Sequence, residues 1–113
     1  MTTRKYSSRS QQTTLSGAIT SGDLTMLVGS GANLLASVGF SPAGTFTVVI
    51  DPDTALEEIV DVSNYAAGNT LTIARNIDGS SAVAHSAGAI VRHMVIGRDL
   101  SESNTHILSL IHI

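Results

Sequence analysis

The strongest strand signal in the chain lies at residues 45–51, which read Thr-Phe-Thr-Val-Val-Ile-Asp. Strands favour β-branched and aromatic residues, which make up most of this segment. Because side chains alternate along a strand, Phe46, Val48 and Ile50 share one face, and we expect that face to point into a core. Residues 51–54, Asp-Pro-Asp-Thr, are typical of a turn, since proline fixes φ and aspartate side chains accept local backbone hydrogen bonds.

Shorter segments of the same character lie on both sides of this strand. Together they predict strands at residues 13–16, 24–28, 45–51, 57–63, 70–75 and 89–96. The strands at 57–63 and 70–75 are expected to form a hairpin, because the loop at 64–69 between them contains Gly68-Asn69. The strand at 89–96 carries apolar residues on both faces, which suits a strand covered on two sides or one in contact with another subunit.

Composition limits the class of protein. The chain has 113 residues, no cysteine and no tryptophan, with 42% hydrophobic and 13% charged residues. This length suits one domain, and a chain this apolar is not disordered throughout. Without cysteine there is no disulfide framework, and no apolar run approaches the roughly 20 residues that a membrane span needs. The net charge of −3 argues against a nucleic-acid-binding surface, so we expect neither nucleic acid nor membrane as a partner.

These observations predict an all-β fold, a small sandwich or squat barrel of about six to seven strands. We expect three parts along the chain. An extended N-terminal arm covers residues 1–12, the β domain covers residues 13–97, and a short C-terminal helix at residues 98–113 serves in oligomerisation.

The arm is basic and has no apolar periodicity. Arg4, Lys5 and Arg9 account for three of the six basic residues of the chain, and Tyr6 lies among them. We expect these four residues to bind a partner, the alternative being a frayed and solvated terminus. No apolar segment follows the basic residues, so this start does not match a secretory signal.

The end of the chain has a helical pattern. Asp99 is expected to cap a helix, with Glu102 at its third position. A largely apolar stripe follows the spacing of one helix face at Leu100, Asn104, Ile107 and Ile111, and Leu108 and Leu110 lie beside it. Because the β domain is small, this stripe is expected to pack against its own sheet or against identical helices, and we take it, with Leu108, as the oligomer interface.

Carboxylates are concentrated in one place, at Asp51, Asp53, Glu57, Glu58 and Asp61. Such a cluster is able to bind Ca²⁺, but the roughly 12-residue ligand pattern with a central glycine is missing. A glycosidase pair is the other option, yet the chain lacks the aromatic platform that binds sugars. We therefore expect a solvated turn followed by the start of a strand, and no metal site.

The histidines are His85, His93, His106 and His112, and no pair has the spacing of a helical metal site. His85 and His93 would come together if the last strand folded back, but a histidine that holds a turn through backbone hydrogen bonds is the commoner case. No serine lies in a nucleophile elbow, and Gly29-Ser30-Gly31 lacks the later glycine and lysine of a phosphate loop. We expect no catalytic residue and no cofactor, and thus not an enzyme.

Five segments of the chain form a recognisable set, with further similarity at residues 13–16 and 98–107. The five are Gly44 to Asp51, Glu57 to Val62, Gly68 to Arg75, Asp78 to His85 and Ala87 to His93. The set resembles the N-terminal module of tail-fibre and other appendage proteins of tailed bacteriophages. Its most specific parts are the Glu-Glu-Ile-Val strand and the Asp-Gly-Ser-Ser…Ala-His-Ser-Ala-Gly loop. The module usually has glycine where this chain has Asn76, a departure that concerns the local turn.

The resemblance implies a structural protein of the virion, which has no catalytic residues to carry over. Its expected role is to attach a tail fibre or similar appendage, or form its base, through contacts with other virion proteins of the tail, neck or capsid. We expect a homotrimer that is assembled in the bacterial host cytoplasm. The alternatives are a capsid decoration (cement) or neck protein, a carbohydrate-binding adhesion module, against which the scarcity of aromatics argues, and a metal-dependent enzyme.

Overall fold

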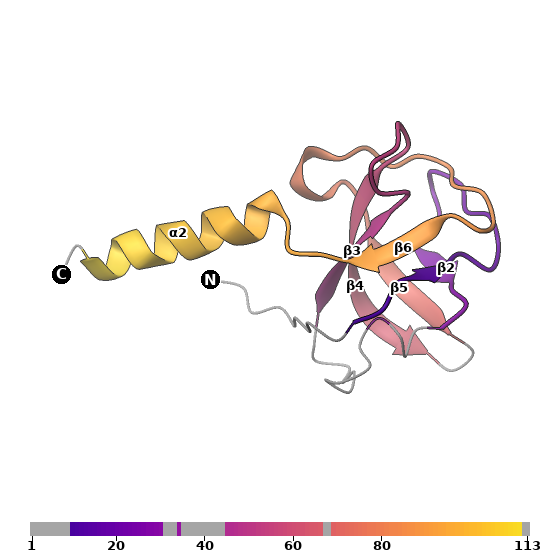
Figure 1. Cartoon of the computed structure of the whole chain (residues 1–113), viewed down its shortest axis with the longest axis horizontal. Coiled ribbons are helices and arrows are strands. Elements are labelled where there is room, and N and C mark those ends of the chain that lie inside the picture. Colours follow the sequence, from indigo (N-terminus) through magenta and orange to yellow (C-terminus); the bar gives the residue numbers. More distant parts are fainter. Residues whose placement is uncertain (1–9, 31–33, 35–44, 67–68, 112–113) are drawn as a thin grey trace.

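The computed structural model describes residues 10–30, 34, 45–66 and 69–111, and of residues 64–66 and 106–111 it describes the backbone. The elements are β1 (Thr13–Thr14), β2 (Thr25–Leu27), β3 (Phe46–Ile50), β4 (Glu58–Ala66), β5 (Thr70–Ala74), the 3₁₀ turn η1 (Ile77–Gly79), β6 (Ile90–His93) and α2 (Gly97–Ile111). Figure 1 shows the strands as one curled sheet from which α2 projects. The predicted all-β class, with six strands and a short C-terminal helix, is confirmed.

The strands form a single sheet in the order β1-β6-β3-β4-β5-β2, and every neighbouring pair is antiparallel. The sheet curls into a half-barrel, which brings its two outer strands together. Leu15, directly after β1, forms a bridge with Val28, directly after β2, and backbone hydrogen bonds of 2.8 and 2.9 Å flank this bridge. Because the outer strands bond to each other, the architecture is closer to the predicted squat barrel than to a sandwich.

The core fills the inside of the curl. Its buried side chains are Leu15, Ile19, Met26, Val28, Leu34, Phe46, Val48, Ile50, Val60, Val62, Leu71, Ile73, Ala89 and Val91. Phe46, Val48 and Ile50 are among them, as the alternation along β3 predicts. The other face of β3 is covered as well, because Thr47 and Val49 are also buried. β3 is therefore the strand that the fold covers on both sides.

The strand predicted at residues 89–96 is shorter than expected and is not covered on both sides. β6 ends at His93, and only Val91 among its residues is fully buried, whereas Ile90 and Arg92 stay partly exposed. Of the two alternatives for this strand, two-sided coverage within the chain is wrong. Contact with another subunit stays a prediction.

The hairpin predicted after residue 57 is confirmed as β4 and β5, but β4 is longer than expected. It continues to Ala66 and so includes part of the loop predicted at 64–69. Its register against β5 shifts between Val62 and Asn64, which marks a β-bulge. A bulge bends a strand and increases its twist, and this one lies in the longest strand of the curled sheet.

Among the residues that the structure describes, five turn residues other than glycine have a left-handed backbone. They are Asp51, Asp53, Asn69, Asn76 and Asp78, with φ between 50° and 63°. Asparagine and aspartate tolerate this conformation better than other residues with a Cβ atom. The turn predicted at 51–54 is confirmed. At Asn76, with φ 61° and ψ 41°, either glycine or asparagine fits, so the departure from the resembled module is compatible with the same turn.

Candidate functional site

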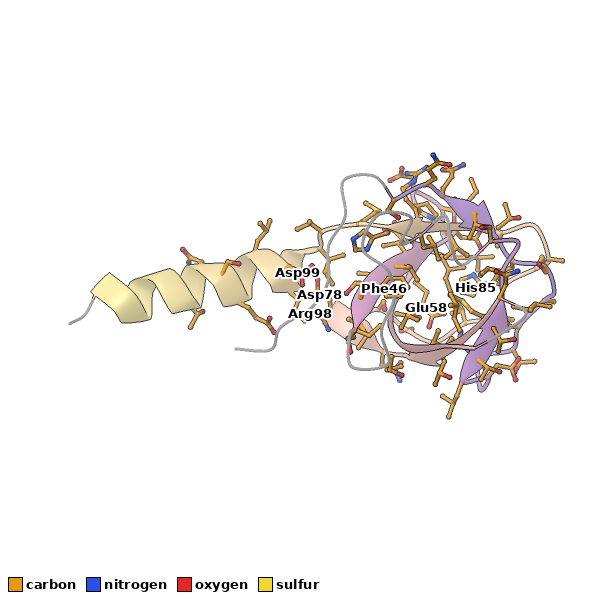
Figure 2. The ribbon with its side chains drawn as sticks, turned by 90° about the horizontal axis from the view of Figure 1, so that it is seen from below. Phe46, Glu58, Asp78, His85, Arg98 and Asp99 are labelled. Atoms are coloured by element: carbon orange, nitrogen blue, oxygen red, sulfur yellow. The ribbon has the colours of Figure 1, made fainter. Side chains whose placement is uncertain are left out.

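The helix α2 is the most prominent feature outside the sheet. It leaves the curled sheet at its first turn and extends away from it (Figures 1 and 2). Its 15 residues correspond to a length of about 22 Å, in a molecule whose long axis measures 50 Å. Within the described part of the chain, no helix is long and apolar enough to cross a membrane.

The predicted oligomer interface lies along this helix. Leu100 is 65% exposed and Asn104 is exposed too, so at these positions the stripe does not pack against its own sheet. Packing on the sheet, one of the two expected alternatives, is therefore wrong for these two residues. Ile107, Leu108 and Ile111 lie in α2, but their side chains are outside the description. Association with identical helices stays a prediction.

The predicted partner-binding arm falls on residues that the structure does not describe. Arg4, Lys5, Tyr6 and Arg9 all lie in residues 1–9. Their role therefore also stays a prediction.

Two carboxylates cap the N-terminus of α2. Asp99 accepts a hydrogen bond from the backbone N–H of Ile96 at 3.0 Å, and Asp78 accepts one from the N–H of Arg98 at 3.1 Å. Because α2 begins at Gly97, Asp99 caps the helix from its third residue and not from the position before the first turn, where the sequence pattern predicts it. Both carboxylates lie at the positive end of the helix dipole, where negative charge is stabilising. Asp78 belongs to η1, so this contact joins the helix to a distant loop.

Arg98 fastens the first turn of α2 to the sheet. Its guanidinium donates to both carboxylate oxygens of Asp61 at 2.9 Å, and also to the hydroxyl of Thr47 at 3.0 Å. The Thr47 hydroxyl donates in turn to Asp61 at 2.8 Å. Asp61 is in β4 and Thr47 in β3, so a bidentate ion pair fixes the direction in which the helix leaves the sheet. Figure 2 shows Arg98, Asp78 and Asp99 gathered at this junction.

A second charged cluster lies at the end of the sheet near the turn between β3 and β4. Here the fully buried carboxylate of Glu58 pairs with the nearly buried guanidinium of Arg75 at 2.7 Å. All five N–H groups of Arg75 donate hydrogen bonds, two to Glu58 and three to the backbone carbonyls of Thr20, Asp23 and Val83. Arg75 therefore holds together three segments that are distant in sequence.

His85 completes this cluster, which we call the buried charged network: Asp51, Glu58, Arg75 and His85. The Nδ1 atom of His85 lies 2.8 Å from Asp51 and its Nε2 atom lies 2.8 Å from Glu58. Its backbone also pairs with Ile19. The expectation that a histidine side chain holds a turn through hydrogen bonds to the backbone is therefore wrong for His85, whose ring nitrogens contact carboxylates. His93 does contact the backbone, since its Nδ1 lies 2.7 Å from the carbonyl of Thr47, but this contact joins the neighbouring strands β6 and β3 and holds no turn.

The network corrects the interpretation of the acidic cluster. Asp53 and Glu57 are exposed, as expected of a solvated turn. Glu58 is fully buried, and Asp61 is paired with Arg98. The sequence does contain a signal for the burial of Glu58. Side chains alternate along a strand, so Glu58 lies on the same face as Val60 and Val62, which point into the core. Among the described residues, no group of three or more His, Cys, Asp or Glu side chains is arranged to hold a metal ion.

The contacts of Glu58 shift its pKa. Burial by itself raises the pKa, but hydrogen bonds from Arg75, from His85 and from the backbone N–H of Val83 outweigh this, and the pKa of Glu58 lies below its ordinary value of 4.5. The same hydrogen bond raises the pKa of Arg75 above its ordinary value. Glu58 therefore remains ionised in the folded protein.

This lowered pKa predicts loss of stability in acid. A carboxyl whose pKa is lower in the folded state stabilises the fold above its unfolded-state pKa, and this contribution disappears as the pH falls through the folded-state value. We expect Glu58→Gln to lower the free energy of unfolding most at neutral pH, and progressively less below about pH 4.5. Urea titrations of both proteins across this range measure the difference. The matched control is Glu57→Gln at an exposed neighbour, and a pH-independent effect of Glu58→Gln would contradict the prediction.

No known protein family and no curated protein matches the sequence of this chain.

Proposed function

We propose that this protein is a structural component of a bacteriophage virion, which attaches a tail fibre or similar appendage or forms its base. The observation that carries the proposal is the seating of α2. Arg98 ties its first turn to β3 and β4, while Leu100 in the same turn is 65% exposed and the helix extends away from the sheet (Figure 1). A helix that is firmly seated at one end and exposes Leu100 and Asn104 at the start of a predicted stripe is suited to join other chains.

The stripe favours association with identical helices. Leu100, Asn104, Ile107 and Ile111 are spaced by four, three and four residues, the spacing of the inner positions of a coiled coil. Isoleucine at both kinds of inner position favours three or four strands over two, and Leu108 widens the stripe. These features support a homotrimer with the stripe at the threefold contact.

The remaining surfaces fit a connector. The arm residues Arg4, Lys5, Tyr6 and Arg9 would bind an acidic surface of another virion protein of the tail, neck or capsid. Weak contacts of this kind add up in a multivalent particle, because each contact raises the effective concentration for the next. The resemblance of residues 13–107 to the appendage module supports the same role.

The oligomer is tested by placing a charge in the stripe. We expect Ile107→Asp to convert the trimer into a monomer in analytical sedimentation, because a carboxylate at a buried inner position has no partner there. Thr105→Asp is the matched control, since Thr105 is exposed on the same helix and lies outside the stripe. This control should remain trimeric. If Ile107→Asp leaves the mass unchanged, the trimer through α2 is wrong.

The location is tested by antibody labelling of intact virions in the electron microscope. The proposal predicts label at the point where an appendage joins the particle. Label spread over the capsid shell would instead indicate a decoration protein, and particles without label would exclude a virion role. The sedimentation and labelling results are independent, so each part of the proposal can fail separately.

A further inference from the structure

The buried charged network places the His85 ring between two carboxyl groups. The imidazole is fully buried between two carboxylates, with Nδ1 at 2.8 Å from Asp51 and Nε2 at 2.8 Å from Glu58. Asp51 lies in the turn after β3, Glu58 begins β4, and His85 belongs to the loop between η1 and β6. Figure 2 shows Glu58 and His85 beside each other within the curled sheet.

Both contacts require a proton on the histidine side. An ionised carboxylate only accepts hydrogen bonds, and a neutral imidazole has a single N–H group to donate. Glu58 already accepts two hydrogen bonds from Arg75 and one from the backbone N–H of Val83, so it is the acceptor toward Nε2. The carboxylate of Asp51 is partly solvated at 20% exposure, and it is the acceptor toward Nδ1. With both carboxyls ionised, only the imidazolium form donates to both.

We propose that His85 is buried as an imidazolium, and that its Nδ1 proton latches the loop at residues 80–88 to the turn after β3. The charges balance in this arrangement, since two cations, Arg75 and His85, face two carboxylates, Asp51 and Glu58. The described segment between β1 and β2 that pairs with His85 contributes the backbone of Ile19, which carries no charge.

Loss of the Nδ1 proton releases the latch. The lone pair of Nδ1 would then face the Asp51 carboxylate at hydrogen-bond distance, which places two acceptors against each other. Water reaches this side of the pair, because Asp51 is partly exposed, whereas the Nε2 contact to Glu58 is fully buried. The loop then keeps the two backbone hydrogen bonds between His85 and Ile19, with N···O distances of 2.9 and 3.0 Å, but loses its contact with the turn after β3. This latch is independent of the proposed virion role.

The protonation state is tested on the whole protein by ¹⁵N–¹H correlation spectra of the imidazole nitrogens. At about pH 7, where an ordinary histidine is largely neutral, we expect both nitrogens of His85 to carry a proton. A spectrum with one protonated and one bare nitrogen at His85 would overturn the proposal.

The latch is tested by amide hydrogen exchange at His85 and Ile19, corrected for the intrinsic effect of pH. We expect protection in the wild type to fall by about tenfold or more across the pH range in which the imidazole spectra show Nδ1 losing its proton. In Asp51→Asn we expect no such fall, since the amide can donate to a bare Nδ1. Asparagine also suits the left-handed backbone at this position, where φ is 53°. A flat wild-type profile, or an equal fall in both proteins, would refute the latch. The spectrum of the wild type decides the protonation state even if the variant fails to fold.

Discussion

Replacement of Arg75 by methionine is expected to lower the free energy of unfolding by about 3–5 kcal/mol, the usual cost of removing one partner from a buried ion pair. The side chain of Glu58 is 0% exposed, so its charge would remain in the interior with two of its hydrogen bonds lost. The carbonyls of Thr20, Asp23 and Val83 would lose their donor as well. Urea denaturation at a fixed protein concentration measures this loss.

Arg92→Met is the control for this experiment. Arg92 carries the same charge and side chain, but it bonds to Gln12 at an exposed site on the sheet. Exposed contacts of this kind contribute about 0–1 kcal/mol. If Arg75→Met is no more destabilising than Arg92→Met, the network does not hold this end of the fold together.

Truncation of Phe46 to alanine is expected to cost about 3–5 kcal/mol, as is usual for a buried aromatic residue. Phe46 is 1% exposed, lies opposite Val62 on β4, and makes an edge-to-face contact with the ring of His93 at 6.0 Å between centroids. The variant would therefore leave a cavity between β3 and its neighbours on both sides. The same denaturation measurement applies.

Phe46→Leu separates volume from ring geometry. Leucine keeps most of the buried apolar surface, so we expect this variant to lose less than about 1.5 kcal/mol. An alanine variant no less stable than the leucine variant would show that Phe46 lies at a place the fold can repack. If Phe46→Ala loses more unfolding free energy than Phe46→Leu, and the slope of that free energy against urea concentration is unchanged, the result would support the place of Phe46 at the centre of the core.

Most strands could be predicted from the sequence because alternation is a local property. Phe46, Val48 and Ile50 share a face whatever lies around them, and the same holds for Leu71 and Ile73 in β5. The joining of the outer strands at Leu15 and Val28 could not be predicted. It depends on how far the whole sheet curls, and no short segment specifies this.

The charged contacts were harder to predict because they join segments distant in sequence. Glu58 and Arg75 lie 17 residues apart. The one local sign of their burial is that, by alternation along the strand, each falls on the same face as its inward-pointing neighbours. That sign competes with the general rule that charged residues are solvated. At the helix start, Asp78 caps a residue that follows it by 20 positions, and a capping pattern of four consecutive residues does not include such a partner.

The meeting of β1 and β2 has a consequence for handling the protein at high concentration. The free backbone of an edge strand is a template on which further chains add, and amyloid growth starts from such templates. At Leu15 and Val28 this backbone is already occupied by the opposite edge. The backbone groups that form this closure are therefore not available as a template for a second chain.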